Sequence, residues 1–215
     1  GVTAADREQI GVVFDELPFN QTIFTSHLGK VMAGIYQNWD MELYQQYLKR
    51  FALPDKKELK EFSRGMKMKL TIAAALSHQA KLLVLDEATA GLDPIVRDEI
   101  LDLFSEFTRD ETHSVLISSH ILSDLEKICD YVAFLHQGQL LFCEEKDALL
   151  ERYGILNDTA EQAEALRPEA IAAKTSTPYG GVRALVRRDL APADFQLEKP
   201  TIEDIILFLA KGETQ

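Results

Sequence analysis

An unbroken apolar run that ends in two adjacent carboxylates constrains the fold of this chain more than any other feature. The run is Leu82–Leu85, and the acids are Asp86 and Glu87. A short continuous apolar stretch predicts a strand that is buried on both faces of a parallel sheet. Burying an unpaired carboxylate is costly, so such an acid pair usually faces a cation or a reacting group. The alternative is a strand end followed by a solvated acidic turn.

Strands and helices alternate on either side of this run. Ile10–Phe14 and Ser114–Ser118 predict two further strands, and helices are predicted for Phe62–His78 and Pro94–Thr108. This alternation predicts parallel βαβ units with right-handed crossovers. In the second helix we expect five side chains to face inward: Ile95, Ile100, Leu101, Phe104 and Phe107.

A helical block occupies residues 26–62. Apolar side chains recur there at helical spacing, and Asp40 and Pro54 are positioned to begin and end its second helix. The block holds many of the aromatic residues, for which we favour core packing over cofactor stacking. Some of them, such as Trp39, could instead meet a partner.

The rest of the chain predicts a hairpin at residues 131–143, a helix at 146–153 and then a weaker pattern. Residues 151–215 are interpreted as a small appended region, with a short strand at Val182–Val186 and a final helix at Ile205–Ala210. Nothing in this region suggests chemistry of its own.

Charge and cysteine content exclude several classes of protein. The 35 acidic and 23 basic residues give a net charge of −12, which argues against nucleic acid as the main partner. Cys129 and Cys143 lack metal-ligand spacing, so a reducing cytosol is the simpler expectation. No apolar run approaches the roughly 18 to 20 residues that span a bilayer, so we expect a soluble chain that can still dock on a membrane partner.

Two further places are candidate sites. Ser63 is a natural N-cap, Gly65 allows another molecule to approach the backbone, and the first turn of this helix lacks an acid, so it can bind an anion. A simple helix cap is the alternative. His120 follows the strand Ser114–Ser118, where a lone histidine is more often structural than catalytic.

Considered together, four motifs resemble the nucleotide-binding subunit of ATP-binding-cassette (ABC) transporters over roughly residues 8 to 150. Leu82–Glu87 resembles the Walker B strand, Ala90–Asp93 the D-loop, Phe62–Met66 the signature motif and His120 the switch histidine. The spacings also fit, with 48 residues from Asp15 to the start of the signature helix, which leaves room for a helical subdomain.

The resemblance implies an α/β fold with an ABC-ATPase-like parallel sheet core, a helical subdomain and a small C-terminal appendage. The implied division is an ATPase domain at 1–150, including the helical subdomain at about 26–62, and an appended region at 151–215. The implied cofactors are ATP and Mg²⁺. Asp86 would hold the metal, Glu87 would activate the attacking water, and His120 would sense the γ-phosphate.

The resemblance also implies nucleotide contacts outside the acid pair. Ser63, Arg64 and Gly65 would cap the nucleotide of the opposite subunit in a head-to-tail dimer, and Asp93 would lie in the D-loop. Asp15 stands at the Q-loop position, where it would touch both nucleotide and Mg²⁺. The implied partners are a second ATPase subunit and a transmembrane permease subunit, not nucleic acid. The implied location is cytoplasmic, peripheral on the inner face of the cell membrane.

Three departures from the family pattern stand out. Asp15 replaces the Q-loop glutamine, Arg64 and Met66 alter the signature, and no G-x-x-x-x-G-K-[ST] phosphate loop occurs. We expect that loop to lie upstream of residue 1 in a longer protein. A non-enzymatic docking module remains an alternative, as does a related ATPase that acts on chromosomes or ribosomes.

Overall fold

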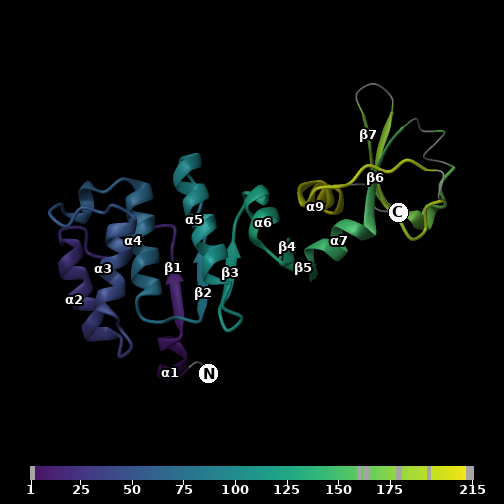
Figure 1. Ribbon diagram of the computed structural model, residues 1–215. Coiled ribbons are helices and arrows are strands. Elements are labelled where there is room, and N and C mark those ends of the chain that lie inside the picture. Colours follow the sequence, from purple (N-terminus) through teal and green to yellow (C-terminus); the bar gives the residue numbers. More distant parts are fainter. Residues whose placement is uncertain (1–2, 159–160, 162–164, 178–180, 193–194, 212–215) are drawn as a thin grey trace. The chain divides into compact units, whose positions relative to one another are not determined.

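The computed structural model describes residues 3–158, 161, 165–177, 181–192 and 195–211. The chain divides into two compact units, Gly1–Ile121 and Leu122–Gln215 (Figure 1). The sequence suggested a division near residue 150 instead. The hairpin and helix before that point belong to the second unit because their apolar residues Val132, Phe142 and Leu149 share a core with Ile155 and Leu185.

The first unit is built on a parallel three-stranded sheet, as the sequence predicted. Its strands lie in the order β1 (Ile10–Val13), β2 (Leu82–Asp86) and β3 (Ser114–Ser118). A short helix, α1 (Ala4–Glu8), precedes β1 and was not predicted. Parallel pairing places the carboxyl ends of all three strands at one edge.

Helix α4 (Arg64–Leu76) packs closely against β1 because both surfaces carry small residues. Ala73 and Ala74 are buried on the helix. At Gly11 of β1, an added Cβ would lie 2.9 Å from the carbonyl oxygen of Ala75 and 2.8 Å from Leu83 Cδ2. The small residues of α4 and Gly11 of β1 therefore allow the close approach of this helix to the sheet.

The two faces of the sheet differ in exposure. Leu83 and Leu85 are 0% and 1% exposed, whereas Val12 and Leu116, which flank Val84 in register, are 42% and 63% exposed. The prediction that β2 is buried on both faces is therefore wrong. Leu82 and Val84 are only partly buried because the described residues of this unit leave their face largely uncovered.

Helix α5 (Pro94–Phe107) follows β2 within the first unit. Ile100, Leu101 and Phe104 are buried, as expected. Ile95 is 74% exposed, which corrects its inward assignment. Ile95 lies in the first turn of the helix, directly after Pro94, and the buried side chains of this helix begin only at Ile100.

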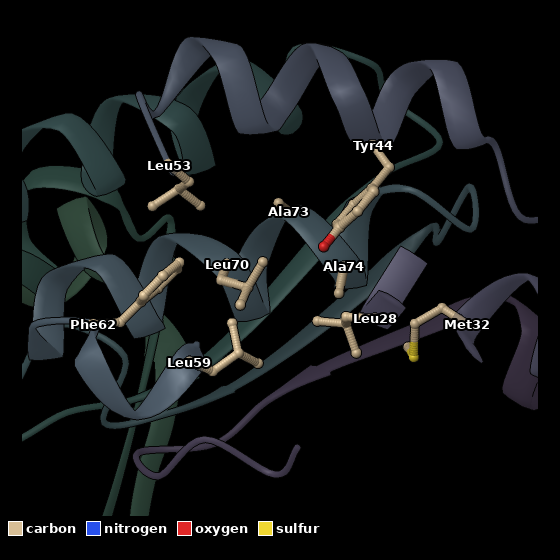
Figure 2. Packing of buried hydrophobic residues seen from close by; sticks show 9 residues of the cluster. All are labelled: Leu28, Met32, Tyr44, Leu53, Leu59, Phe62, Leu70, Ala73 and Ala74. Carbon is tan, nitrogen blue, oxygen red and sulfur yellow. The ribbon is translucent and has the colours of Figure 1, made fainter. Parts of the chain in front are cut away.

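The helical block forms its own core on α4. Helices α2 (Thr25–Ile35) and α3 (Met41–Arg50) and the 3₁₀ turn η1 (Leu59–Glu61) surround this core, which is drawn in Figure 2. The preference for core packing is confirmed by four aromatic side chains that pack partly buried against the cluster and by Tyr44, which is 1% exposed. These four are Tyr36, Trp39, Tyr47 and Phe51. On α2, the outward positions are aliphatic instead, since Val31 and Ile35 are 52% and 62% exposed.

The second unit combines an antiparallel hairpin with a three-stranded antiparallel sheet in the order β6-β8-β7. The predicted hairpin and final helix are present, but β6 and β7 were missed in a segment whose pattern is weak. The elements are α6 (Leu122–Ile128), β4 (Tyr131–His136), β5 (Gln139–Glu145), α7 (Lys146–Arg152), β6 (Tyr153–Asp158), η2 (Pro168–Ala170), β7 (Ile171–Ser176), β8 (Val182–Arg187) and α9 (Ile202–Lys211). Across the described parts of both units, no helix is long and apolar enough to cross a bilayer.

Candidate functional site

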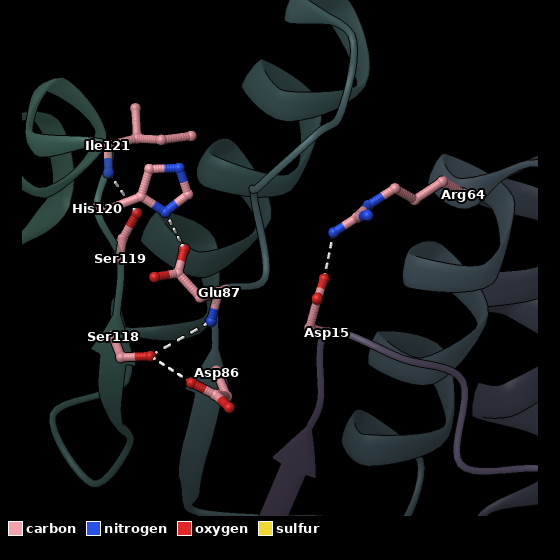
Figure 3. A network of polar contacts seen from close by, with 8 residues as sticks. All are labelled: Asp15, Arg64, Asp86, Glu87, Ser118, Ser119, His120 and Ile121. Carbon is pink, nitrogen blue, oxygen red and sulfur yellow. Dashed lines mark hydrogen bonds and ion pairs between the residues drawn. The ribbon is translucent and has the colours of Figure 1, made fainter.

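The carboxylate of Asp86 is fixed by a hydroxyl on the neighbouring strand. Parallel register pairs Asp86 at the end of β2 with Ser118 at the end of β3. The Ser118 hydroxyl donates to Asp86 Oδ1 at 2.7 Å (Figure 3). A hydrogen bond of this kind orients the acid while leaving its other oxygen available to a ligand.

Glu87 leaves the strand in a left-handed conformation, with φ = 51°. Its backbone N–H donates to the Ser118 carbonyl at 3.1 Å and lies 3.3 Å from the Ser118 hydroxyl. A non-glycine residue in this region is held at a conformational cost and persists only where its surroundings determine it. The effect is to turn the Glu87 side chain away from that of Asp86, toward the end of β3.

His120 meets Glu87 at that point. Its Nδ1 lies 2.7 Å from Glu87 Oε2, and the two side chains are 71% and 32% exposed. The Ser119 hydroxyl accepts from the N–H of Ile121 at 3.0 Å, which fixes the backbone on both sides of the histidine. The imidazole therefore orients Glu87 and remains open to solvent on its other side (Figure 3).

The start of α4 has the features that the sequence predicted. The Ser63 hydroxyl accepts from the N–H of Met66 at 3.2 Å, and the first turn holds no acid. Gly65 also has a packing role, since an added Cβ would lie 3.2 Å from Val96 Cγ1 on α5. The small residue at this position thus allows the first turns of two helices to approach each other.

The segment that follows Glu87 is a tight turn into α5. Asp93 caps that helix, and its Oδ1 accepts from the N–H groups of Ile95 and Val96 at 3.2 and 3.1 Å. Gly91 has φ = +66°, and a Cβ added there would lie 3.2 Å from both Cζ and Nε of Arg64. One carboxylate oxygen of Asp93 therefore caps helix α5. The contact of Asp93 with nucleotide stays a prediction.

Asp15 and Arg64 form an ion pair across 49 residues of sequence. Asp15 lies in the loop after β1, and its carboxylate points toward the Arg64 guanidinium rather than toward Asp86 (Figure 3). A cavity of about 380 Å³ lies beside the pair, lined in part by Lys67, Met68 and Thr71. No group of three or more acidic, histidine or cysteine side chains suited to a metal occurs among the described residues.

The predicted site residues therefore fall into two sets. Asp86, Glu87 and His120 come together at the ends of β2 and β3, whereas Asp15 and Arg64 pair with each other. Sequence reasoning missed the role of Ser118, which contacts both acids. The available signal was a hydroxyl at the carboxyl end of the neighbouring strand, but only the register reveals that it faces Asp86.

The oxygen donors at Asp86 are of the kind that binds Mg²⁺ in nucleotide sites. Mg²⁺ in nucleotide sites is usually held by one or two carboxylates together with phosphate and water oxygens. Asp86 is an exposed carboxylate at a strand end, with one oxygen already oriented by Ser118. This donor set fits Mg²⁺ without a larger cluster of protein ligands.

The first unit is thus an α/β unit whose parallel sheet presents an Asp-Glu pair and a histidine at adjoining strand ends. The ABC transporter family model matches residues 2–90 of this chain. The lantibiotic transport ATP-binding protein SrtF of Streptococcus pyogenes is 35% identical over 147 residues, which are 66% of this chain and 62% of SrtF. The bacitracin transport ATP-binding protein BcrA of Bacillus licheniformis is 46% identical over 86 residues, which are 40% of this chain and 28% of BcrA.

Solved structures show the same fold. The cbiO1 protein of Clostridium perfringens, part of the ABC transporter complex cbiONQ, superposes with a TM-score of 0.56 at 25% identity, covering 67% of this chain and 61% of that one. A dimeric ATP-binding cassette in a post-hydrolysis state with ADP and Pi gives a TM-score of 0.58 at 17% identity, covering 66% of this chain and 64% of that one. The chain spans about half to three fifths of the length of the curated relatives SrtF and YtrB.

Proposed function

We propose that this chain is part of an ATP-binding and ATP-hydrolysing subunit of an ABC transporter. The observation that carries the proposal is the contact between His120 Nδ1 and Glu87 Oε2, 2.7 Å long, beside an Asp86 carboxylate oriented by Ser118. A solvated acidic turn would need neither contact. The names of the relatives SrtF and BcrA, both transport ATP-binding proteins, support the same function.

The chemistry assigned to each residue follows from its surroundings. Glu87 would accept a proton from, or orient, the water that attacks the γ-phosphate of ATP, and His120 would hold Glu87 in place and face the developing phosphate charge. Asp86 would hold Mg²⁺, which when bound supplies positive charge against the phosphate oxygens. The exposed amides at the start of α4, with Ser63 and Gly65, would bind phosphate across a dimer of two ATPase subunits.

The proposed transporter also includes a transmembrane permease subunit, which would place this chain at the inner face of the cell membrane. Most aromatic residues of the helical block pack into its core, so they are unsuited to forming this contact. The large apolar side chains that the block exposes are Val31 and Ile35 on α2. We assign the permease contact to this exposed face, in place of Trp39. A docking module without enzymatic activity is not favoured by the relatives or by the geometry.

The test is the Glu87→Gln variant of the full-length protein. We expect kcat for ATP hydrolysis to fall by at least about 100-fold, because the amide cannot accept the proton. Nucleotide affinity should stay within about threefold of wild type, since the amide keeps the size and hydrogen-bonding reach of the acid. ATP turnover and equilibrium nucleotide binding are the two measurements.

Glu99→Gln is the matched control. Glu99 is an exposed acid on α5 whose partner is Lys69, outside the proposed site. This variant should hydrolyse ATP at the wild-type rate. Unchanged turnover in Glu87→Gln would remove Glu87 from the mechanism.

A further inference from the structure

Arg64 contacts two loops that the sequence gives no reason to connect. Its guanidinium pairs with Asp15 in the loop after β1, and it also lies against Gly91, where an added Cβ would be 3.2 Å from Arg64 Cζ and Nε. A planar guanidinium has five N–H donors and a flat face, so it can pair with a carboxylate and pack on a turn simultaneously. The first residue of α4 therefore joins the loop after β1 to the turn after Glu87.

The direction of these contacts separates Arg64 from its neighbours. Ser63 and Gly65, on either side of it, belong to a helix start whose amides are proposed to serve a second subunit. The Arg64 side chain instead turns into its own unit (Figure 3). We propose that Arg64 is a positioning residue that acts on its own subunit's site, through Asp15 and the Gly91 turn.

The pair contributes little to stability by itself. Its side chains are 49% and 46% exposed, and ion pairs at such exposure contribute little to folding. The Asp15–Arg64 pair acts instead on the geometry of the turn after Glu87. Gly91, which Arg64 contacts, lies four residues beyond Glu87 in this turn, and both residues have positive φ. A displacement of about 1 Å in a site-forming loop is enough to slow a reaction strongly.

Two of the departures of this sequence from the family pattern, Asp15 and Arg64, thus compensate for each other. The acid at residue 15 and the arginine at residue 64 are partners, so each should be harmful without the other. The effect on turnover rests on the proposed ATPase function, whereas the effect on the two loops does not.

The test is a charge-reversal cycle in the full-length protein: Asp15→Arg, Arg64→Asp and the double variant. Each single change should lower kcat for ATP hydrolysis by about tenfold, with KM for ATP within about threefold, because the loops rather than the nucleotide contacts are displaced. The double variant should recover most of the loss. Hydrogen exchange in segments 15–21 and 88–93 should rise in both single variants and fall again in the double variant.

Arg50 and Glu106 provide the matched control cycle. Their ion pair, 2.6 Å long, has side chains that are 46% and 50% exposed and lies outside the site. Reversing either charge should leave kcat and both exchange segments unchanged.

Each outcome bears on one of the two proposals. The role of Arg64 would be overturned if the double variant hydrolysed ATP no faster than the slower single variant. It would also be overturned if hydrogen exchange in the two segments were the same in wild type and in all three variants. Absence of ATP hydrolysis in the wild-type protein would overturn the proposed function, and the exchange measurement would then decide the role of Arg64 alone.

Discussion

His78 is a buried histidine at a junction of three elements in the first unit. It is 1% exposed, its Nδ1 lies 3.0 Å from the Glu8 carbonyl oxygen, and its ring stacks on Tyr36 with 4.0 Å between ring centroids. Burial lowers the pKa of His78, against a smaller opposing effect of the Glu8 carbonyl and carboxylate. The folded protein therefore holds this imidazole neutral at a pH where an exposed histidine takes up a proton.

The sign of the pH dependence follows from that lowered pKa. The unfolded chain binds a proton at His78 below about pH 6.5, and the folded chain does so only at lower pH, so stability is complete above pH 6.5 and declines below it. We expect the free energy of unfolding in urea to fall between about pH 7 and pH 5. His78→Gln should flatten this dependence.

His27→Gln is the control for this prediction, because His27 is exposed on α2. The control should keep the wild-type slope. A slope that survives in His78→Gln would show that another group titrates in this range.

At single residues, the sequence indicated three side chains that the structure brings together, but not all of the contacts between candidate residues. Asp86, Glu87 and His120 were recognisable from their positions after apolar runs. The pairing of Asp15 with Arg64 was not, because 49 residues separate them and nothing local links an acid in a loop to the first residue of a helix. Contacts of this kind depend on tertiary packing, which periodicity does not encode.

Among the elements, the packing of α4 on β1 offers a direct test at Gly11. A methyl group there would lie 2.9 Å from a backbone oxygen, which cannot rotate away, and 2.8 Å from Leu83 Cδ2. We expect Gly11→Ala to destabilise the protein by about 1 to 3 kcal/mol through overpacking. Denaturant unfolding measures the change.

Gly34→Ala provides a control of opposite sign. Gly34 lies within α2, and nothing stands within 4 Å of a Cβ added there. Alanine should stabilise that helix by roughly 0.5 to 1 kcal/mol, because it restricts the unfolded chain. Similar effects for the two substitutions would contradict the close approach of α4 to β1.

Elements with a strong period were predicted well, and those with a weak one were missed. The strands β1, β2 and β3 and the helices α4 and α5 lie within a few residues of their predicted bounds. Strand β7 lies at the end of a stretch rich in acids and alanine, and β6 follows directly on a predicted helix. Their side chains become buried only when β8 pairs with both, and this long-range pairing leaves little local signal.

For the molecule as a whole, one face of the first sheet is covered and the other is exposed, so substitutions on its two faces should differ in their effect on stability. Leu116 and Leu83 lie on neighbouring strands of one sheet, but they are 63% and 0% exposed. In the 215-residue chain, Leu83→Ala should cost about 2 to 5 kcal/mol, and Leu116→Ala should stay within about 0.5 kcal/mol of wild type.

Dye binding completes this comparison. The exposed apolar face should bind a hydrophobic fluorescent dye in the folded chain, and Leu116→Ala should reduce the signal. A loss of stability at Leu116 equal to that at Leu83 would mean that both faces are covered in solution.

The left-handed backbone at Glu87 bears on how this protein could be engineered. Left-handed geometry costs a residue with a side chain roughly 1 to 2 kcal/mol, and glycine or asparagine tolerates it better. A directed-evolution campaign scored on heat resistance alone would therefore tend to discard this acid and retain the fold. Given the role proposed for Glu87, variants of this protein should be selected for turnover and thermal tolerance together, because at this position the two goals favour different amino acids.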